Sequence, residues 1–131
     1  MEHHPVGSRP GRAASAADFT GEVTMQPLAA AAEPGRHRVA LVTFQPGART
    51  NWHTHPYGQT LYVVSGRGRA GTEGGEVVEF GPGDVLHFAA GERHWHGAAP
   101  DAEMSHLAIG EAKDGATADW EEPVSDADYA G

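Results

Sequence analysis

The sequence has no cysteine among its 131 residues. Disulfides and thiolate metal sites are therefore excluded, and redox chemistry would need a bound cofactor. The chain also lacks an apolar run of about 18 residues, which a membrane span requires. Its first residues, MEHHPVGSRPGR, lack the apolar stretch of a signal peptide. We therefore expect a cytoplasmic protein with no membrane partner.

Basic residues are scarce. Nine Lys and Arg stand against 18 Asp and Glu, which gives a formal net charge of −9. Half of the acids lie in residues 101–131, where Lys113 is the only base. A phosphate-binding surface needs clustered Arg and Lys, so this balance argues against a nucleic-acid partner. The acidic end is expected to be a hydrated surface.

Long amphipathic patterns are absent, and short apolar runs broken by Gly and Pro take their place. A weakly alternating segment at 18–29 could form a first edge strand, and residues 67–75 read as a glycine-rich hairpin. The clearest apolar runs are 38–44, 59–66, 76–80, 85–90 and 104–110. Five or more strands at a spacing of roughly 8–12 residues predict an all-β sandwich or barrel.

The length favours one domain with a single core. Residues 1–17 are rich in Gly, Pro, Ala, Ser and Arg without periodicity, which predicts a flexible N-terminal arm. We expect the barrel domain to span residues 18–131 and to end in a short C-terminal extension. That extension can hold at most a helical turn near Ser125–Tyr129, with Ser125 as a plausible cap.

Histidines recur in pairs at the spacing of one strand face. In GARTNWHTHPYGQTL, His53 and His55 are two residues apart, and Gln59 follows after a turn that can bring its amide back toward them. In GERHWHG, His94 and His96 repeat the spacing. One such pair is more often a hydrogen-bonded surface or core feature, but two in similar strands favour a metal site.

These residues fall into two motifs that resemble those of the cupins, small double-stranded β-helix (jelly-roll) barrels with a metal near one mouth. The first motif is Gly47, His53, His55, Gln59 and Gly66, with glutamine in place of the family's glutamate. The second motif is Gly83, Ala89 in place of proline, Gly91, His94, and Ala98 in place of asparagine. The resemblance implies an all-β fold, a single cupin barrel.

Further segments narrow the resemblance. GARTNWHTHPYGQTL, PGDVLHFAAGERHWHGAAP, MSHLAIGE and the Asp-Trp pair at 119–120 are similar to the small bacterial cupin hydroxynitrile lyases, which are manganese-dependent and act on (R)-cyanohydrins. The resemblance implies Mn²⁺ as cofactor, a cyanohydrin, or an aldehyde and cyanide, as substrate, His106 as the base, and His96 in the cavity wall. The metal ligands that it implies are His53, His55, Gln59 and His94.

The amide at Gln59 has a physical consequence for such a site. Three imidazoles and an amide oxygen are neutral, so a bound dication keeps its full charge, whereas a glutamate would cancel one unit of it. Three nitrogens and one oxygen also suit Fe²⁺, Zn²⁺, Ni²⁺ or Co²⁺, so the donor set alone leaves the metal open. The alternative is that Gln59 only hydrogen-bonds inside a metal-free barrel.

Strand parity suggests the rest of the cavity. Ala40, Val42 and Phe44 share one face, and Leu61 follows Gln59 on the same side; Thr50 could add a hydroxyl. Any of these could instead be barrel core, most of all Phe44 and Leu61.

Two other functions stay open beside the lyase. One is an oxidoreductase that uses iron and O₂, and the other is a module whose metal only holds a ligand. A strand at 18–28 with an exposed edge invites pairing, so we expect a homodimer or homotetramer.

Overall fold

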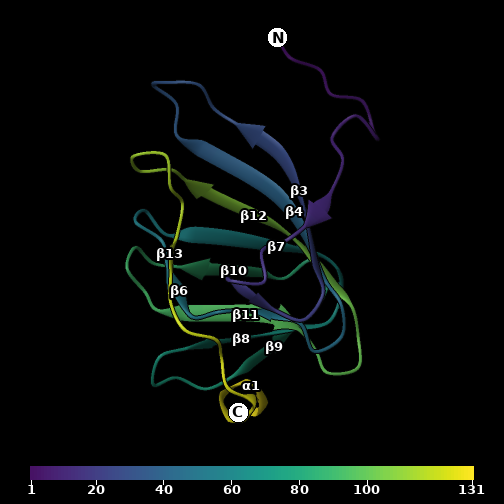
Figure 1. Cartoon of the computed structure of the whole chain (residues 1–131), viewed down its shortest axis with the longest axis vertical. Coiled ribbons are helices and arrows are strands. Elements are labelled where there is room, and N and C mark those ends of the chain that lie inside the picture. The colour runs from purple at the N-terminus through teal and green to yellow at the C-terminus, as the bar shows by residue number, and fades with distance from the viewer.

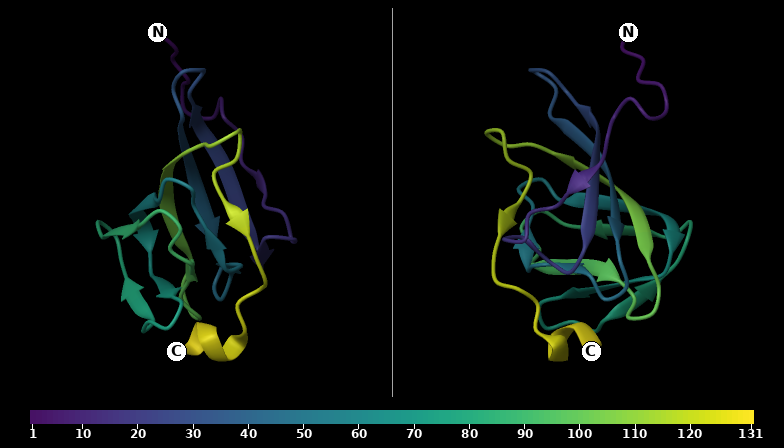
Figure 2. Two further views of the ribbon diagram at one scale, coloured as in Figure 1. Left: turned by 90° about the vertical axis from the view of Figure 1, so that its left-hand side faces the viewer. Right: turned by 45° about the vertical axis from the view of Figure 1, so that its right-hand side comes forward.

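Two curled β-sheets form the framework of the protein. The computed structural model describes residues 1–131, and its only helix has five residues and is too short to cross a membrane. The ribbon shows the strands stacked across the molecule, with the two termini at opposite ends (Figure 1). The turned views show the strands curling round a common interior (Figure 2). The all-β barrel predicted from the sequence is confirmed.

The first sheet has six strands in the order β1-β3-β4-β12-β7-β10. Its pairings are antiparallel, with His106 of β12 opposite Val42 of β4 and Gly110 opposite Arg38. The strands are β1 (Arg12–Ala13), β3 (Val23–Ala30), β4 (His37–Phe44), β7 (Gln59–Gly66), β10 (Val85–Phe88) and β12 (Met104–Glu111).

The second sheet faces the first. Five of its strands follow the order β13-β6-β11-β5-β2, while β8 pairs with both β11 and β9. Its strands are β2 (Phe19–Thr20), β5 (Arg49–Thr50), β6 (His53–Thr54), β8 (Gly68–Thr72), β9 (Val78–Phe80), β11 (His94–Ala98) and β13 (Asp119–Trp120).

Two local expectations need revision. The segment expected to be a glycine-rich hairpin is mostly strand β8, because its glycines let it lie close to β11: a Cβ at Gly71 would overlap the Trp95 indole. Only residues after Thr72 form the turn. In the N-terminal arm, Arg12–Ala13 forms strand β1 against β3, so the outer edge of β3 is paired at Thr24 and Met25.

The main core lies between the sheets. Phe44, Leu61, Val63 and Met104 are fully buried in a cluster of twelve buried hydrophobic residues. A smaller cluster behind the second sheet joins Trp52 and Trp95 to Val124 and Tyr129 of the C-terminal segment. Apolar side chains therefore fill one end of the barrel and leave the other end for a cavity.

The C-terminal segment runs down one side of the barrel to α1 (Asp126–Ala130), as the yellow ribbon shows (Figure 1). Ser125 caps the helix and accepts a hydrogen bond from the Asp128 amide, as the sequence predicted. The Tyr129 hydroxyl donates to the Ala98 carbonyl at 2.6 Å. The segment is therefore fastened to β11, the strand that carries His94 and His96.

Candidate metal centre and its cavity

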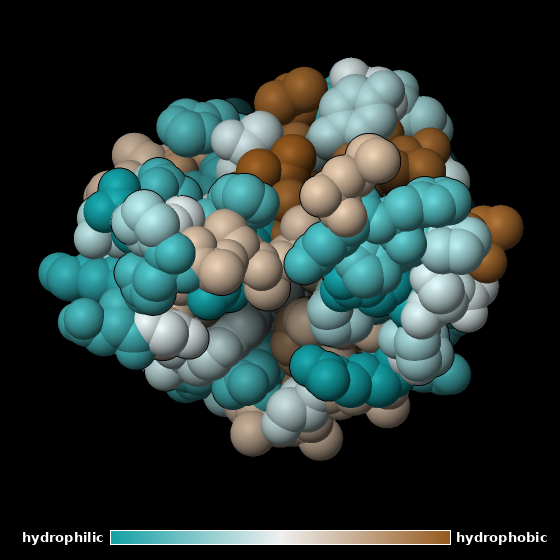
Figure 3. Space-filling view, turned by 90° about the horizontal axis from the view of Figure 1, so that it is seen from above, coloured by the Kyte–Doolittle hydropathy of each residue, from teal (hydrophilic) through white to brown (hydrophobic).

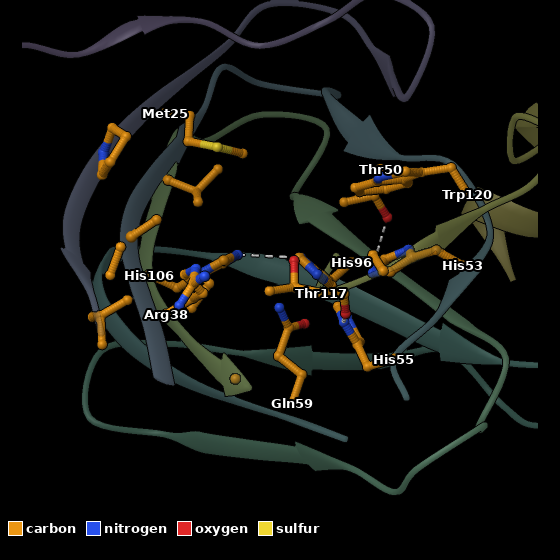
Figure 4. Close-up of a pocket in the computed structure, with 18 of the residues that line it drawn as sticks. Met25, Arg38, Thr50, His53, His55, Gln59, His96, His106, Thr117 and Trp120 are labelled. Carbon is orange, nitrogen blue, oxygen red and sulfur yellow. Dashed lines mark hydrogen bonds between the residues drawn. The ribbon is translucent and has the colours of Figure 1, made fainter. Parts of the chain in front are cut away.

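A cavity of about 300 Å³ lies between the two sheets at the end that the core leaves open. Met25, Arg38 and His106 reach it from the first sheet, and Thr50 and His53 from the second (Figure 4). Its volume is at the lower end of the range for small-molecule sites. The space-filling view shows a largely hydrophilic face that is hollowed near its centre (Figure 3).

Three histidine rings meet on one side of this cavity. The ring centroids of His53 and His94 are 4.3 Å apart, those of His53 and His55 are 4.9 Å apart, and those of His55 and His94 are 5.2 Å apart. His53 on β6 lies directly opposite His94 on β11 in the strand register. His55 follows the end of β6 and turns back toward the same point. The predicted convergence of these three imidazoles is present.

Backbone carbonyls fix the tautomer of each ring. Nδ1 of His53 lies 2.9 Å from the Asn51 carbonyl, Nδ1 of His55 lies 2.6 Å from that of Thr117, and Nδ1 of His94 lies 2.8 Å from that of Glu92. A carbonyl can only accept, so each Nδ1 carries the ring proton and each Nε2 keeps a lone pair. This is the arrangement of metal-binding histidines, whose second nitrogen is held by the protein.

Several buried polar atoms here have no partner in the protein. They include Nε2 of His55, Nε2 of His94 and Oε1 of Gln59. Leaving a buried acceptor unsatisfied costs about 1–3 kcal/mol, and two imidazole lone pairs with a nearby amide oxygen are a donor set that suits a divalent cation. The residues therefore fit a bound metal ion.

His96 is a further donor at the same point. One ring nitrogen each from His53, His94 and His96 lie within 4.8 Å of one another, which makes these three a cluster able to hold an ion. The cluster shares His53 and His94 with the predicted ligand set and has His96 in place of His55. A three-histidine metal site is therefore supported by geometry that does not depend on Gln59.

Burial keeps all of these rings neutral at pH 7. It lowers the pKa of His94 and of His106 to about 4, and it lowers the pKa of His55 less strongly. The pKa values of His53 and His96 fall well below the ordinary value, first through burial and then through repulsion from neighbouring histidines. Neutral imidazoles keep the lone pairs that bind a metal or accept a proton.

His106 and His96 form a hydrogen-bonded pair across the barrel. Nε2 of His106 lies 3.2 Å from Nδ1 of His96, and both rings line the cavity (Figure 4). Nδ1 of His106 is buried without a partner. Phe44 packs against both rings, with centroids 5.8 Å from His96 and 5.4 Å from His106. The pair can therefore share a proton inside an apolar enclosure.

The remaining predicted residues divide between cavity and core. Ala40, Val42 and Thr50 line the cavity, and the Thr50 hydroxyl accepts a hydrogen bond from the His96 amide at 3.1 Å. Phe44 and Leu61 lie instead in the fully buried core. Parity gave their face correctly but not their depth. Phe44 lies opposite Met104, beyond the level of His106, whereas Leu61 is level with the cavity residue Ala108 and is nevertheless fully buried.

His94 lies behind the cavity wall, stacked on Phe88 with ring centroids 3.6 Å apart. Its free Nε2 is still directed among the clustered histidines, since His53, His55 and His96 all have ring centroids within 5.9 Å of it. Phe88 thus holds the ring in place from the side of the core.

Sequence reasoning missed three contributors. Trp120 packs on the His53 ring with centroids 4.5 Å apart, and the Thr117 carbonyl holds His55. Both belong to the C-terminal segment, which pairs with β6 through β13. No local sequence pattern predicts that pairing. Arg38 could have been found, because it lies two residues before Ala40 on the same strand face.

Comparison with known proteins identifies a family and individual proteins to which this chain is similar. Residues 40–110 match the cupin domain family. The (R)-mandelonitrile lyase of Granulicella tundricola is 54% identical over 129 residues, which cover 98% of each chain. Among solved structures, a cupin-like protein from Thermotoga maritima is 36% identical with a TM-score of 0.87, covering 95% of this chain and 94% of that one.

More distant structures share the fold alone. The polyketide cyclase RemF from Streptomyces resistomycificus is 18% identical, with a TM-score of 0.73, and the match covers 98% of this chain and 90% of that one. Similarity at this level extends to the arrangement of strands and not to the reaction.

Proposed function

The chain belongs to the cupin family, and on that premise we propose that it is a hydroxynitrile lyase that cleaves cyanohydrins to an aldehyde and hydrogen cyanide. The observation that carries the proposal is the histidine-lined cavity in a chain 54% identical, over nearly its whole length, to an (R)-mandelonitrile lyase. In the reverse direction the same site would join the two products.

We propose that His53, His55, Gln59 and His94 hold a divalent metal ion, with Mn²⁺ as our first choice from the resemblance to manganese-dependent lyases. The support is the set of unpaired acceptors at His55, His94 and Gln59, together with the carbonyls that orient the imidazoles. A bound dication would supply Lewis acidity, undiminished by any carboxylate ligand, which lowers the pKa of a substrate hydroxyl.

His106 is the proposed base. Burial lowers its pKa to about 4, which leaves the ring neutral with a lone pair at pH 7 but makes it a weak base. Transfer of the cyanohydrin's hydroxyl proton to it would therefore depend on a bound metal lowering the pKa of that hydroxyl. Loss of that proton lets the oxygen form the aldehyde carbonyl while the bond to the nitrile carbon breaks. The electron pair leaves with cyanide, which takes up the proton to give hydrogen cyanide.

His96 is proposed to position His106 and share its proton. The hydrogen bond between Nε2 of His106 and Nδ1 of His96 gives the accepted proton a second site within the pair. Thr50, which accepts from the His96 amide, still has its hydroxyl proton to donate into the cavity. Ala40 and Val42 are small enough to leave room for the substrate beside these groups.

The test is cyanide release from mandelonitrile by metal-free protein and by protein loaded with Mn²⁺, Fe²⁺ or Zn²⁺. We expect turnover that depends on metal, and a loss of about 100-fold or more in kcat when His106→Asn removes the base. His87→Asn is the matched control, because His87 lies on the exposed face of β10. We expect that control to behave as the wild type does.

Failure of every metal-loaded form to exceed the background rate would overturn the lyase proposal. Oxygen consumption by the Fe²⁺-loaded protein would then favour the oxidoreductase alternative. Full activity of the His106→Asn variant would be consistent with the lyase proposal but would exclude His106 as the base.

A further inference from the structure

The cavity contains one formally charged side chain and no acid. Arg38 lies at its outer end, and neither Asp nor Glu is among the residues that line it. Arg38 is therefore the one formally charged side chain that a molecule bound in this cavity would meet.

Arg38 also differs from most other arginines of the protein in having no carboxylate partner. Its only hydrogen bonds run from Nη1 to the carbonyls of Ala31 and His37, at 3.3 and 3.1 Å. Nε and Nη2 make no hydrogen bond to the protein. The arginines that do pair with carboxylates are Arg36, Arg49, Arg67, Arg69 and Arg93.

The position of Arg38 is set by the strand register. Arg38 lies opposite Gly110, Ala40 opposite Ala108, and Val42 opposite His106. Arg38 is thus four residues, or about 13 Å along the strand, from the level of the proposed base. Ala40 and Ala108 leave the space between them open, and the glycine leaves room beside the guanidinium.

We propose that Arg38 binds a carboxylate at the far end of the substrate, so that the preferred substrates are cyanohydrins or aldehydes with an acid group separated from the reacting carbon by a short apolar spacer. The free Nε and Nη2 donors match the two oxygens of a carboxylate. The small apolar side chains between the two ends fit the spacer. The substrate class rests on the proposed lyase function, whereas carboxylate binding by Arg38 does not.

The test begins with binding, which needs no turnover. Titration calorimetry of the Mn²⁺-loaded protein compares 4-(hydroxymethyl)benzoate with its neutral amide, 4-(hydroxymethyl)benzamide. We expect the carboxylate to bind about 10- to 100-fold more tightly, the effect of one charge-assisted contact. In Arg38→Gln the ratio of the two Kd values should fall to about 1, and Arg38→Lys should restore part of it.

Arg36→Gln is the matched control. Arg36 is two residues earlier in the chain, is exposed, pairs with Glu111 and lies outside the cavity. We expect this variant to keep the wild-type ratio. The metal content and the folded state of each variant are measured alongside, because loss of the dication would by itself weaken carboxylate binding and lower the ratio.

The corresponding kinetic comparison is the ratio of kcat/KM for the cyanohydrins of 4-carboxybenzaldehyde and 4-carbamoylbenzaldehyde. If mandelonitrile is cleaved but Arg38→Gln leaves either ratio unchanged, the Arg38 proposal is overturned and the lyase stands. The Arg38 proposal is overturned in the same way if the carboxylate of the ligand binds at the histidines instead of at Arg38. If the Kd ratio depends on Arg38 but no cyanohydrin is cleaved, carboxylate binding stands and the lyase falls.

Discussion

At the scale of single residues, the buried histidines combine readiness to bind metal with a cost in stability. Neutral imidazoles keep their lone pairs, but the unfolded chain can take up protons that the folded chain excludes. The same burial that keeps the Nε2 lone pairs free for a metal therefore makes the metal-free fold sensitive to acid. This sensitivity can be measured without knowing the reaction.

We predict that the metal-free protein loses stability as the pH falls from about 6.5 to about 4. In that range the unfolded histidines are protonated while His94 and His106, whose folded pKa values are about 4, stay neutral. Each of these two should lower the free energy of unfolding by about 3 kcal/mol by pH 4. Urea denaturation at several pH values measures the effect.

His106→Asn is the control for this titration, since asparagine takes up no proton. Its free energy of unfolding should vary less with pH, by about 1.4 kcal/mol per pH unit between pH 6 and pH 4.5. A wild-type stability that is flat over this range would contradict the account of neutral, buried rings.

At the scale of secondary-structure elements, the position of β11 decides the site. It carries His94 and His96 and is paired with three other strands, β5, β6 and β8. Gly97 lies opposite Arg49 at a close approach of β11 to β5. A Cβ at Gly97 would overlap the Ala48 carbonyl oxygen and the Arg49 backbone. Glycine is therefore required for β11 to lie at its observed depth.

We predict that Gly97→Ala destabilises the protein by at least about 2 kcal/mol, because the backbone of Ala48 and Arg49 would have to move. Gly110→Ala is the matched control in another strand: its Cβ would meet only the Gly58 carbonyl, at an ordinary contact distance of 3.6 Å. We expect a change of about 0.5 kcal/mol or less there. Equal effects of the two substitutions on chemical denaturation would contradict the close approach.

Element by element, the sequence predicted best those strands that contain a clear apolar run. The apolar runs at β4, β7, β10 and β12 all carry a pattern long enough to read. Strands β5, β6 and β13 have two residues each, too few for any alternation. Such strands exist because neighbouring chain segments pair with them, and that pairing is a property of the fold.

At the scale of the whole molecule, the C-terminal segment completes a site whose ligands lie far away in sequence. It supplies the Thr117 carbonyl to His55 and the Trp120 ring to His53, and Asp126 ties it to Arg49 at 2.8 Å. Sequence motifs could therefore place the candidate ligands, while their orientation depends on contacts between distant segments.

The assembly of the protein into a homodimer or homotetramer stays a prediction.

The most direct measurement of the central claim is anomalous diffraction from crystals of the Mn²⁺-loaded protein. We predict one strong peak bound by Nε2 of His53, His55 and His94 and by Oε1 of Gln59, with an open position facing His106. A peak held by His53, His94 and His96 with Gln59 turned away, or no peak among these histidines, would contradict it.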